Sequence, residues 1–173
     1  CDKARGIEQM VKGCYKANVK LYLAGKFTSD EYRRHVEQMP EYSCVKYFGL
    51  LDHDKVVELY QKSSIGLCLL LDEGQYYKAQ NLATKVYEYM AMGLPIIASD
   101  SEYNKKIFSE LDIGLCVNPM DTDSVASNIS SLLRDKKRCK TMGENGRKAI
   151  KKRFNWDKEQ YNLLKLYQEI LDE

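Results

Sequence analysis

The sequence alternates between amphipathic stretches of helical period and short apolar runs rich in β-branched residues. This alternation is typical of βα units, in which each strand of a parallel sheet is followed by a crossover helix. It predicts an α/β fold with a parallel sheet of about five or six strands flanked by helices. The apolar runs place five strands at 19–24, 44–48, 65–70, 95–99 and 113–117.

The stretches between these runs predict helices at 4–16, 29–39, 54–62, 84–92, 102–111 and 121–133, and the chain is helical from there to its end. Ser101, Asp121, and either Asn155 or Asp157 can accept an amide proton at a helix start. Gly93 stands where a left-handed residue ends a helix. An apolar stripe on the last helix is expected to pack into the core, and it consists of Trp156, Tyr161, Leu164, Tyr167 and Leu171.

Length and composition indicate one domain spanning residues 1–173. The chain has 173 residues, of which 44% are hydrophobic and 30% charged, and its net charge of +2 argues against a dedicated nucleic-acid binder. The chain opens at Cys1, without methionine and directly ahead of a helix-like segment, so we expect a fragment whose N-terminal neighbour is missing. No apolar run is long enough to span a bilayer, which leaves peripheral membrane contact open.

No metal site is expected. Six cysteines occur without a C-x-x-C pair, and apolar surroundings for two of them suit a reducing cytoplasm. Two acidic D-x-D patterns, at 52–54 and 121–123, each precede a predicted helix. Helix capping explains these acids without a metal ion.

The start of the predicted helix at 84–92 carries the residues of greatest chemical interest. Amides of Thr84 and Lys85 would point out of the first turn, where the helix dipole favours an anion such as a diphosphate. Glu88 lies one turn further along the same face, and its carboxylate could accept hydrogen bonds from a ribose diol. The alternative is a surface ion pair between Lys85 and Glu88, which the pattern alone favours.

Residues 85–99, KVYEYMAMGLPIIAS, resemble the donor-site signature of the GT-B glycosyltransferases, specifically glycosyltransferase family 4 and its group 1 transferases. Similar elements of that family match RGIE at 5–8, LYLAG at 21–25, YFGLL at 47–51 and FNW at 154–156. The resemblance implies the C-terminal half of a GT-B fold, with a Rossmann-like sheet and a helical C-terminal tail. The resemblance also implies that Glu88 binds ribose and is not a partner in a surface ion pair.

Further residue roles follow from the resemblance. It implies that Arg5 and Lys85 neutralise the donor diphosphate and stabilise it as a leaving group. It implies that Gly25 lets the donor approach the backbone, and that Gly49 and Leu51 border the base. An ordinary strand-to-helix turn is the alternative explanation for these three positions. The complete predicted donor-binding set is Arg5, Gly25, Gly49, Leu51, Gln80, Asn81, Thr84, Lys85 and Glu88.

The sequence departs from the family pattern in the loop at 72–81. Many members carry two glutamates eight positions apart, but here Gln80 stands eight positions before Glu88. Gln80 can hydrogen-bond a sugar but carries no charge. Glu73 supplies a carboxylate in the same loop, so we expect the loop to be reorganised.

The function implied by the resemblance is that of the donor-binding domain of a retaining glycosyltransferase in polysaccharide biosynthesis. It would move a hexose or N-acetylhexosamine from a UDP-sugar or GDP-sugar to a saccharide or lipid-linked acceptor, without a metal or other cofactor. The missing N-terminal domain would hold the acceptor, so the fragment alone is expected to be inactive. The expected location is cytoplasmic, and the basic run at 136–153 is either a solvated face or a contact with the inner membrane surface.

Two other classes of protein stay open. The first is a non-catalytic Rossmann-like binding module or a degenerate glycosyltransferase domain, with Gln80 as a sign of lost sugar recognition. The second, which the motif favours less, is a nucleotide-sugar epimerase or phosphorylase of the same architecture.

Overall fold

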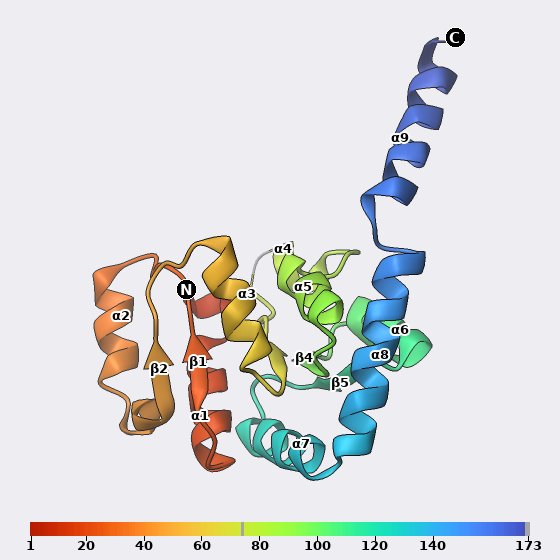
Figure 1. Cartoon of the computed structure of the whole chain (residues 1–173). Coiled ribbons are helices and arrows are strands. Elements are labelled where there is room, and N and C mark those ends of the chain that lie inside the picture. The colour runs from red at the N-terminus through yellow and green to blue at the C-terminus, as the bar shows by residue number, and fades with distance from the viewer. Residues whose placement is uncertain (74, 172–173) are drawn as a thin grey trace.

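The computed structural model describes residues 1–73 and 75–171 and has an α/β architecture (Figure 1). Its strands are β1 (Leu21–Leu23), β2 (Val45–Tyr47), β3 (Gly66–Cys68), β4 (Ile96–Ser99) and β5 (Gly114–Val117). Each strand lies inside one of the five predicted ranges, and every strand pair is parallel. The predicted α/β class and strand positions are therefore confirmed.

The prediction of one sheet of five or six strands is wrong for the described residues. These residues form a two-stranded sheet, β1-β2, and a three-stranded sheet, β3-β4-β5. In the larger sheet Leu67 is in register with Ile97, and Ile97 with Leu115. Among the described residues β1 and β3 form no ladder with each other, and residues of both strands line one cavity.

The helices are α1 (Ile7–Lys16), α2 (Asp30–Glu37), α3 (His53–Gln61), α4 (Gln75–Lys78), α5 (Thr84–Met92), α6 (Glu102–Leu111), α7 (Thr122–Arg134), α8 (Lys136–Lys152) and α9 (Trp156–Leu171). Two 3-10 turns, η1 (Lys3–Arg5) and η2 (Pro40–Cys44), complete the elements. None of the described helices is both long and apolar enough to cross a membrane.

Gly6 interrupts the helix that was predicted over residues 4–16. Its φ of 65° is left-handed, so η1 ends there and α1 begins at Ile7. A Cβ atom on this residue would lie 1.8 Å from the carbonyl oxygen of Leu69. Only glycine can combine that backbone conformation with so close an approach to the segment after β3.

Three of the predicted helix boundaries, at Gly93, Ser101 and Asp121, are confirmed by their capping contacts. Gly93 has a φ of 71° and ends α5, and its N–H donates to the Met90 carbonyl at 3.0 Å. The Ser101 hydroxyl accepts a bond from the first turn of α6, and the Asp121 carboxylate accepts one of 2.9 Å from the Ser124 amide in α7. These contacts satisfy backbone donors and acceptors that a helix end leaves unpaired.

Helices cover both faces of the three-stranded sheet (Figure 1). Side chains alternate between the faces along each strand, so Leu67 and Ile97 enter one apolar cluster with α1 and α7. Cys68 and Ile96 enter a second cluster with α5 and α6. Burial on both faces explains why these strands read as continuous apolar runs in the sequence.

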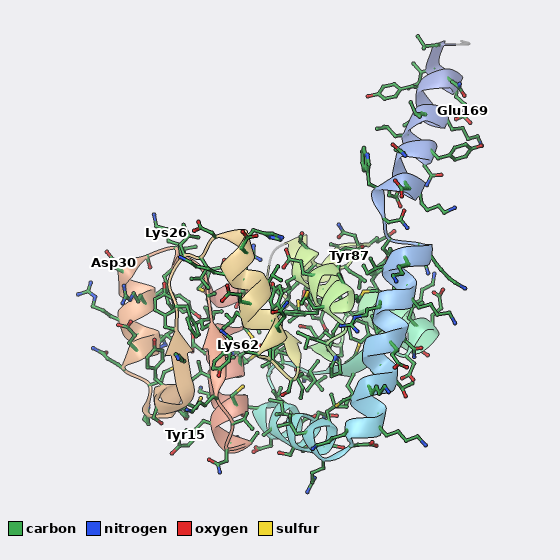
Figure 2. The ribbon with its side chains drawn as sticks, in the orientation of Figure 1. Tyr15, Lys26, Asp30, Lys62, Tyr87 and Glu169 are labelled. Carbon is green, nitrogen blue, oxygen red and sulfur yellow. The ribbon has the colours of Figure 1, made fainter. Side chains whose placement is uncertain are left out.

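The last helix, α9, extends away from the rest of the structure, and Figure 2 shows Glu169 far from the α/β body. Asn155 caps its start by accepting a 3.1 Å bond from the Lys158 amide. No described residue of α9 is buried, and Trp156 and Tyr167 are 66% and 56% exposed. The prediction that the stripe of α9 packs into the core is therefore wrong here.

Removal of residues 156–173 is expected to leave the stability of the α/β body almost unchanged. Since the described part of α9 buries no side chain, the free energy of unfolding should change by less than about 0.5 kcal/mol. The melting temperature, followed by circular dichroism, should shift by less than about 2 °C. A larger loss would show that α9 packs onto the body.

Candidate functional site

A cavity of about 990 Å³ lies between the two sheets and beside η1, α3 and α5. Residues from segments far apart in the sequence meet in its wall. Five of the nine predicted donor-binding residues line it, namely Arg5, Gly25, Leu51, Lys85 and Glu88. The fold thus brings both predicted phosphate-binding cations and the predicted ribose ligand to one cavity.

Parallel strands explain why these residues meet. Gly25 follows β1 and Leu51 follows β2, so both lie beyond the carboxyl ends of strands, where open α/β sheets place their ligands. The Leu71 amide, beyond the end of β3, donates a 2.8 Å hydrogen bond to the Ala4 carbonyl in η1. That bond holds η1, and with it Arg5, beside the end of β3.

Arg5 and Lys85 place positive charge near the end of β3. Burial raises the pKa of the Cys68 thiol, and the charges of Lys85 and Arg5 oppose that rise. Arg5 Nε lies 3.4 Å from Asp2 Oδ2. Within the described part of the chain, no carboxylate forms an ion pair with Lys85. The cavity wall therefore has cationic character suited to an anion.

Glu88 is held by a tyrosine rather than by Lys85. The Tyr60 hydroxyl donates a 2.6 Å hydrogen bond to Glu88 Oε2. Burial raises the pKa of Tyr60, and the bond to Glu88 adds to the rise, so the hydroxyl keeps its proton at neutral pH. The alternative of a Lys85–Glu88 ion pair is not formed among the described residues.

Four predicted residues are not among the described residues that line the cavity: Gly49, Gln80, Asn81 and Thr84. The carbonyl of Gly49 accepts a 2.7 Å bond from the Gly25 amide, which joins the two strand ends next to the cavity. Thr84 is the exposed first residue of α5.

Gln80 and Asn81 are exposed in the loop before α5. Asn81 lines a separate pocket of about 10 Å³ with Ser99 and Asn104. That volume is about the minimum that holds a single water molecule. The prediction of a reorganised loop at 72–81 includes residue 74, which lies outside the described residues, and Glu73 pairs with Lys3 at 3.4 Å.

Leu50 and Tyr60 are two of the lining residues that the sequence analysis did not assign to the site. Leu50 is 79% exposed and lies beside Leu51 at the cavity, so the LL pair after β2 was an available signal. Tyr60 is 28 residues from Glu88 in the chain, and no local pattern connects the two.

Among the described residues, no group of three or more His, Cys, Asp or Glu side chains could hold a metal ion. Asp121 caps α7, as expected of that acidic pattern, whereas Asp52 precedes α3 without a side-chain capping bond, so the capping explanation is not confirmed at 52–54. All six cysteines are free thiols.

Several known proteins are similar to this chain in sequence or in fold. The sequence profile of the family "Glycosyl transferases group 1" matches residues 3–149. Spore coat protein SA of Bacillus subtilis is 28% identical over 125 residues, which are 72% of this chain and 32% of that protein. An uncharacterized glycosyltransferase of Methanocaldococcus jannaschii is 24% identical over 178 residues, which cover 96% of this chain and 43% of that protein. The chain therefore spans less than half the length of these relatives.

Solved structures of GT-B glycosyltransferases have the same fold. Sucrose-phosphate synthase from Thermosynechococcus elongatus matches with a TM-score of 0.82 and 27% identity over 99% of this chain and 43% of its own. Anabaena HepE, solved in complex with UDP-glucose, matches with a TM-score of 0.82 and 14% identity over 98% of this chain and 46% of its own. With the family profile covering most of its length, the chain belongs to the group 1 glycosyl transferases.

Proposed function

We propose that this chain is the donor-binding domain of a retaining glycosyltransferase, which moves a hexose or N-acetylhexosamine from a nucleotide-diphosphate sugar to a saccharide or lipid-linked acceptor. The observation that supports this most strongly is the convergence of Arg5, Lys85 and Glu88 on one cavity beside the strand ends. Family membership supports the transferase class. The UDP-glucose complex of HepE, a protein of the same fold, supports a UDP-sugar ahead of a GDP-sugar.

The diphosphate would be held by cations and by backbone amides. Arg5 and Lys85 face the cavity from η1 and α5, while the first amides of α5, at Thr84 and Lys85, add the positive end of a helix dipole. When the bond to the sugar breaks, negative charge grows on the diphosphate. Groups already placed around it stabilise that charge without reorganising, and this lowers the barrier.

The nucleoside would lie between Glu88 and the loop after β2. The Glu88 carboxylate accepts bonds from the ribose diol, while Leu50 and Leu51 give the base an apolar surface. Gly25 has a φ of 123°, and an added Cβ would meet only the Cys1 sulfur, at 3.6 Å. The bond between Gly25 and Gly49 keeps this wall in place.

The remaining parts of the reaction belong to this proposal as well. Gln80 and Asn81, which are exposed in the loop before α5, contact the donor sugar, and no metal or other cofactor takes part. The acceptor binds to an N-terminal domain that is not within these 173 residues, so the chain alone binds donor without turnover. The proposed setting is polysaccharide biosynthesis in the cytoplasm, with the exposed basic residues of α8 facing the inner membrane surface.

Calorimetric titration with UDP, GDP and ADP tests the proposed function. We expect weak binding that favours one base, and we expect Glu88→Ala to weaken it about 100-fold or more, because two hydrogen bonds to a carboxylate are lost and each is worth about 1.5 to 3 kcal/mol. Glu102→Ala, on an exposed surface outside the cavity lining, is the control and should bind like the unchanged chain. If no nucleotide binds at millimolar concentration, the non-catalytic binding module becomes the better description.

A further inference from the structure

Tyr60 belongs to α3, outside the motif at 85–99, and yet it makes the shortest side-chain contact in the cavity wall. Its hydroxyl donates a 2.6 Å hydrogen bond to Glu88 Oε2, and both residues line the cavity. A hydroxyl that donates to a carboxylate forms a charge-assisted bond, which is about twice as strong as a bond between neutral groups. The contact therefore restricts the rotamers of Glu88 before any ligand binds.

The ring of Tyr60 is itself fixed by packing. It meets the ring of Tyr89 edge to face, with centroids 5.3 Å apart and planes at 79°. The Tyr89 hydroxyl donates a 3.2 Å bond to the Leu67 carbonyl in β3. A Cβ on Gly66 would lie 2.4 Å from the Tyr89 ring, so this glycine makes room for it. A continuous set of contacts thus connects the backbone of β3 to the Glu88 carboxylate.

The hydrogen bond leaves acceptor capacity on Glu88. A carboxylate has about four lone-pair sites, and Tyr60 occupies one of them. The other sites can still receive the two hydroxyls of a ribose. Tyr60 and a ribose diol are therefore compatible partners of the same carboxylate.

We propose that Tyr60 is a positioning residue of the donor site, whose hydroxyl aims the Glu88 carboxylate at the ribose and so makes the site selective for ribonucleotides over 2′-deoxyribonucleotides. This inference rests on the proposed function, because it requires that Glu88 binds ribose. A carboxylate that is already oriented loses less rotamer freedom on binding. The benefit is largest for ligands that offer both hydroxyls, because a 2′-deoxynucleotide presents only its 3′-hydroxyl to the carboxylate.

The test compares UDP, GDP and ADP, each against its 2′-deoxy counterpart, by calorimetry with the chain and its Tyr60→Phe variant. We expect the unchanged chain to prefer the ribonucleotide about tenfold. In Tyr60→Phe the ribonucleotide should bind about fivefold more weakly, and the 2′-deoxynucleotide should change by less than about twofold. The selectivity ratio should therefore fall to about two to fourfold.

Tyr15→Phe is the matched control, because it removes the hydroxyl of an exposed tyrosine outside the cavity lining and leaves the Tyr60–Glu88 bond and the packing around it in place. Its selectivity ratio should equal that of the unchanged chain. The phenylalanine ring preserves the packing in both variants, and thermal unfolding confirms that they are folded.

The outcomes separate the two proposals. Suppose that the unchanged chain prefers ribonucleotides. If Tyr60→Phe then keeps the full selectivity ratio, weakens the ribonucleotide and the 2′-deoxynucleotide equally, or binds the ribonucleotide more tightly, the role of Tyr60 is overturned and the proposed donor site stands. If the chain binds none of the six nucleotides, the proposed function fails, and the inference about Tyr60 fails with it.

Discussion

Gly6→Ala is expected to lower the free energy of unfolding by about 2 to 5 kcal/mol. A residue with a side chain costs about 1 to 2 kcal/mol in the left-handed region. The new Cβ would also lie 1.8 Å from the Leu69 carbonyl oxygen, and relieving that overlap costs about 1 to 3 kcal/mol. Urea unfolding followed by circular dichroism measures the loss.

Gly49→Ala separates the two causes. Gly49 has nearly the same φ, 67°, but no atom lies within 4 Å of an added Cβ. Only the backbone strain applies, so the free energy of unfolding of this variant should fall by about 1 to 2 kcal/mol. Equal losses at Gly6 and Gly49 would contradict the steric argument and leave strain as the cause at both positions.

The position of Gly6 also gives this prediction a functional consequence. Relief of the overlap must move η1 away from the end of β3, and η1 carries Arg5. We therefore expect Gly6→Ala to weaken nucleotide binding even in buffers where the variant remains folded.

The order of elements could be predicted from the sequence because apolar residues are buried in every described strand except β2. Leu67 and Ile97 mark β3 and β4 in this way, and the capping residues Gly93 and Ser101 mark the helix ends beside them. The pairing of strands within a sheet is different. A strand that is buried between helices has the same apolar sequence whichever strand lies next to it. The division into two sheets therefore had no signal in the sequence.

The residues of the candidate site also fall into those that the sequence could predict and those that it could not. Arg5, Lys85 and Glu88 could be named in advance because each belongs to a contiguous motif. Tyr60 could not, because its contact with Glu88 depends on how α3 packs against α5. Local motifs identify residues that could contact a ligand, whereas the residues that orient them depend on tertiary packing.

Lys85→Met is expected to weaken binding of the nucleoside diphosphate about 10- to 100-fold, because a hydrogen bond to a charged group is worth about 1.5 to 3 kcal/mol. Methionine keeps most of the side-chain volume and removes the charge. The corresponding monophosphate, with less charge near Lys85, should lose less affinity. Calorimetry at two ionic strengths should also find that the variant depends less on salt.

Lys62→Met is the matched control for this prediction. Lys62 follows α3, lines the same cavity and is labelled in Figure 2, but its Nζ lies 3.8 Å from Glu58 Oε2. Loss of this charge should change the affinity by less than about twofold, since an exposed pair contributes little. Equal losses in the two variants would mean that the cavity attracts the diphosphate through its overall positive charge. A loss confined to Lys85→Met would mean that the diphosphate binds at the start of α5, where the lysine and the helix amides act together.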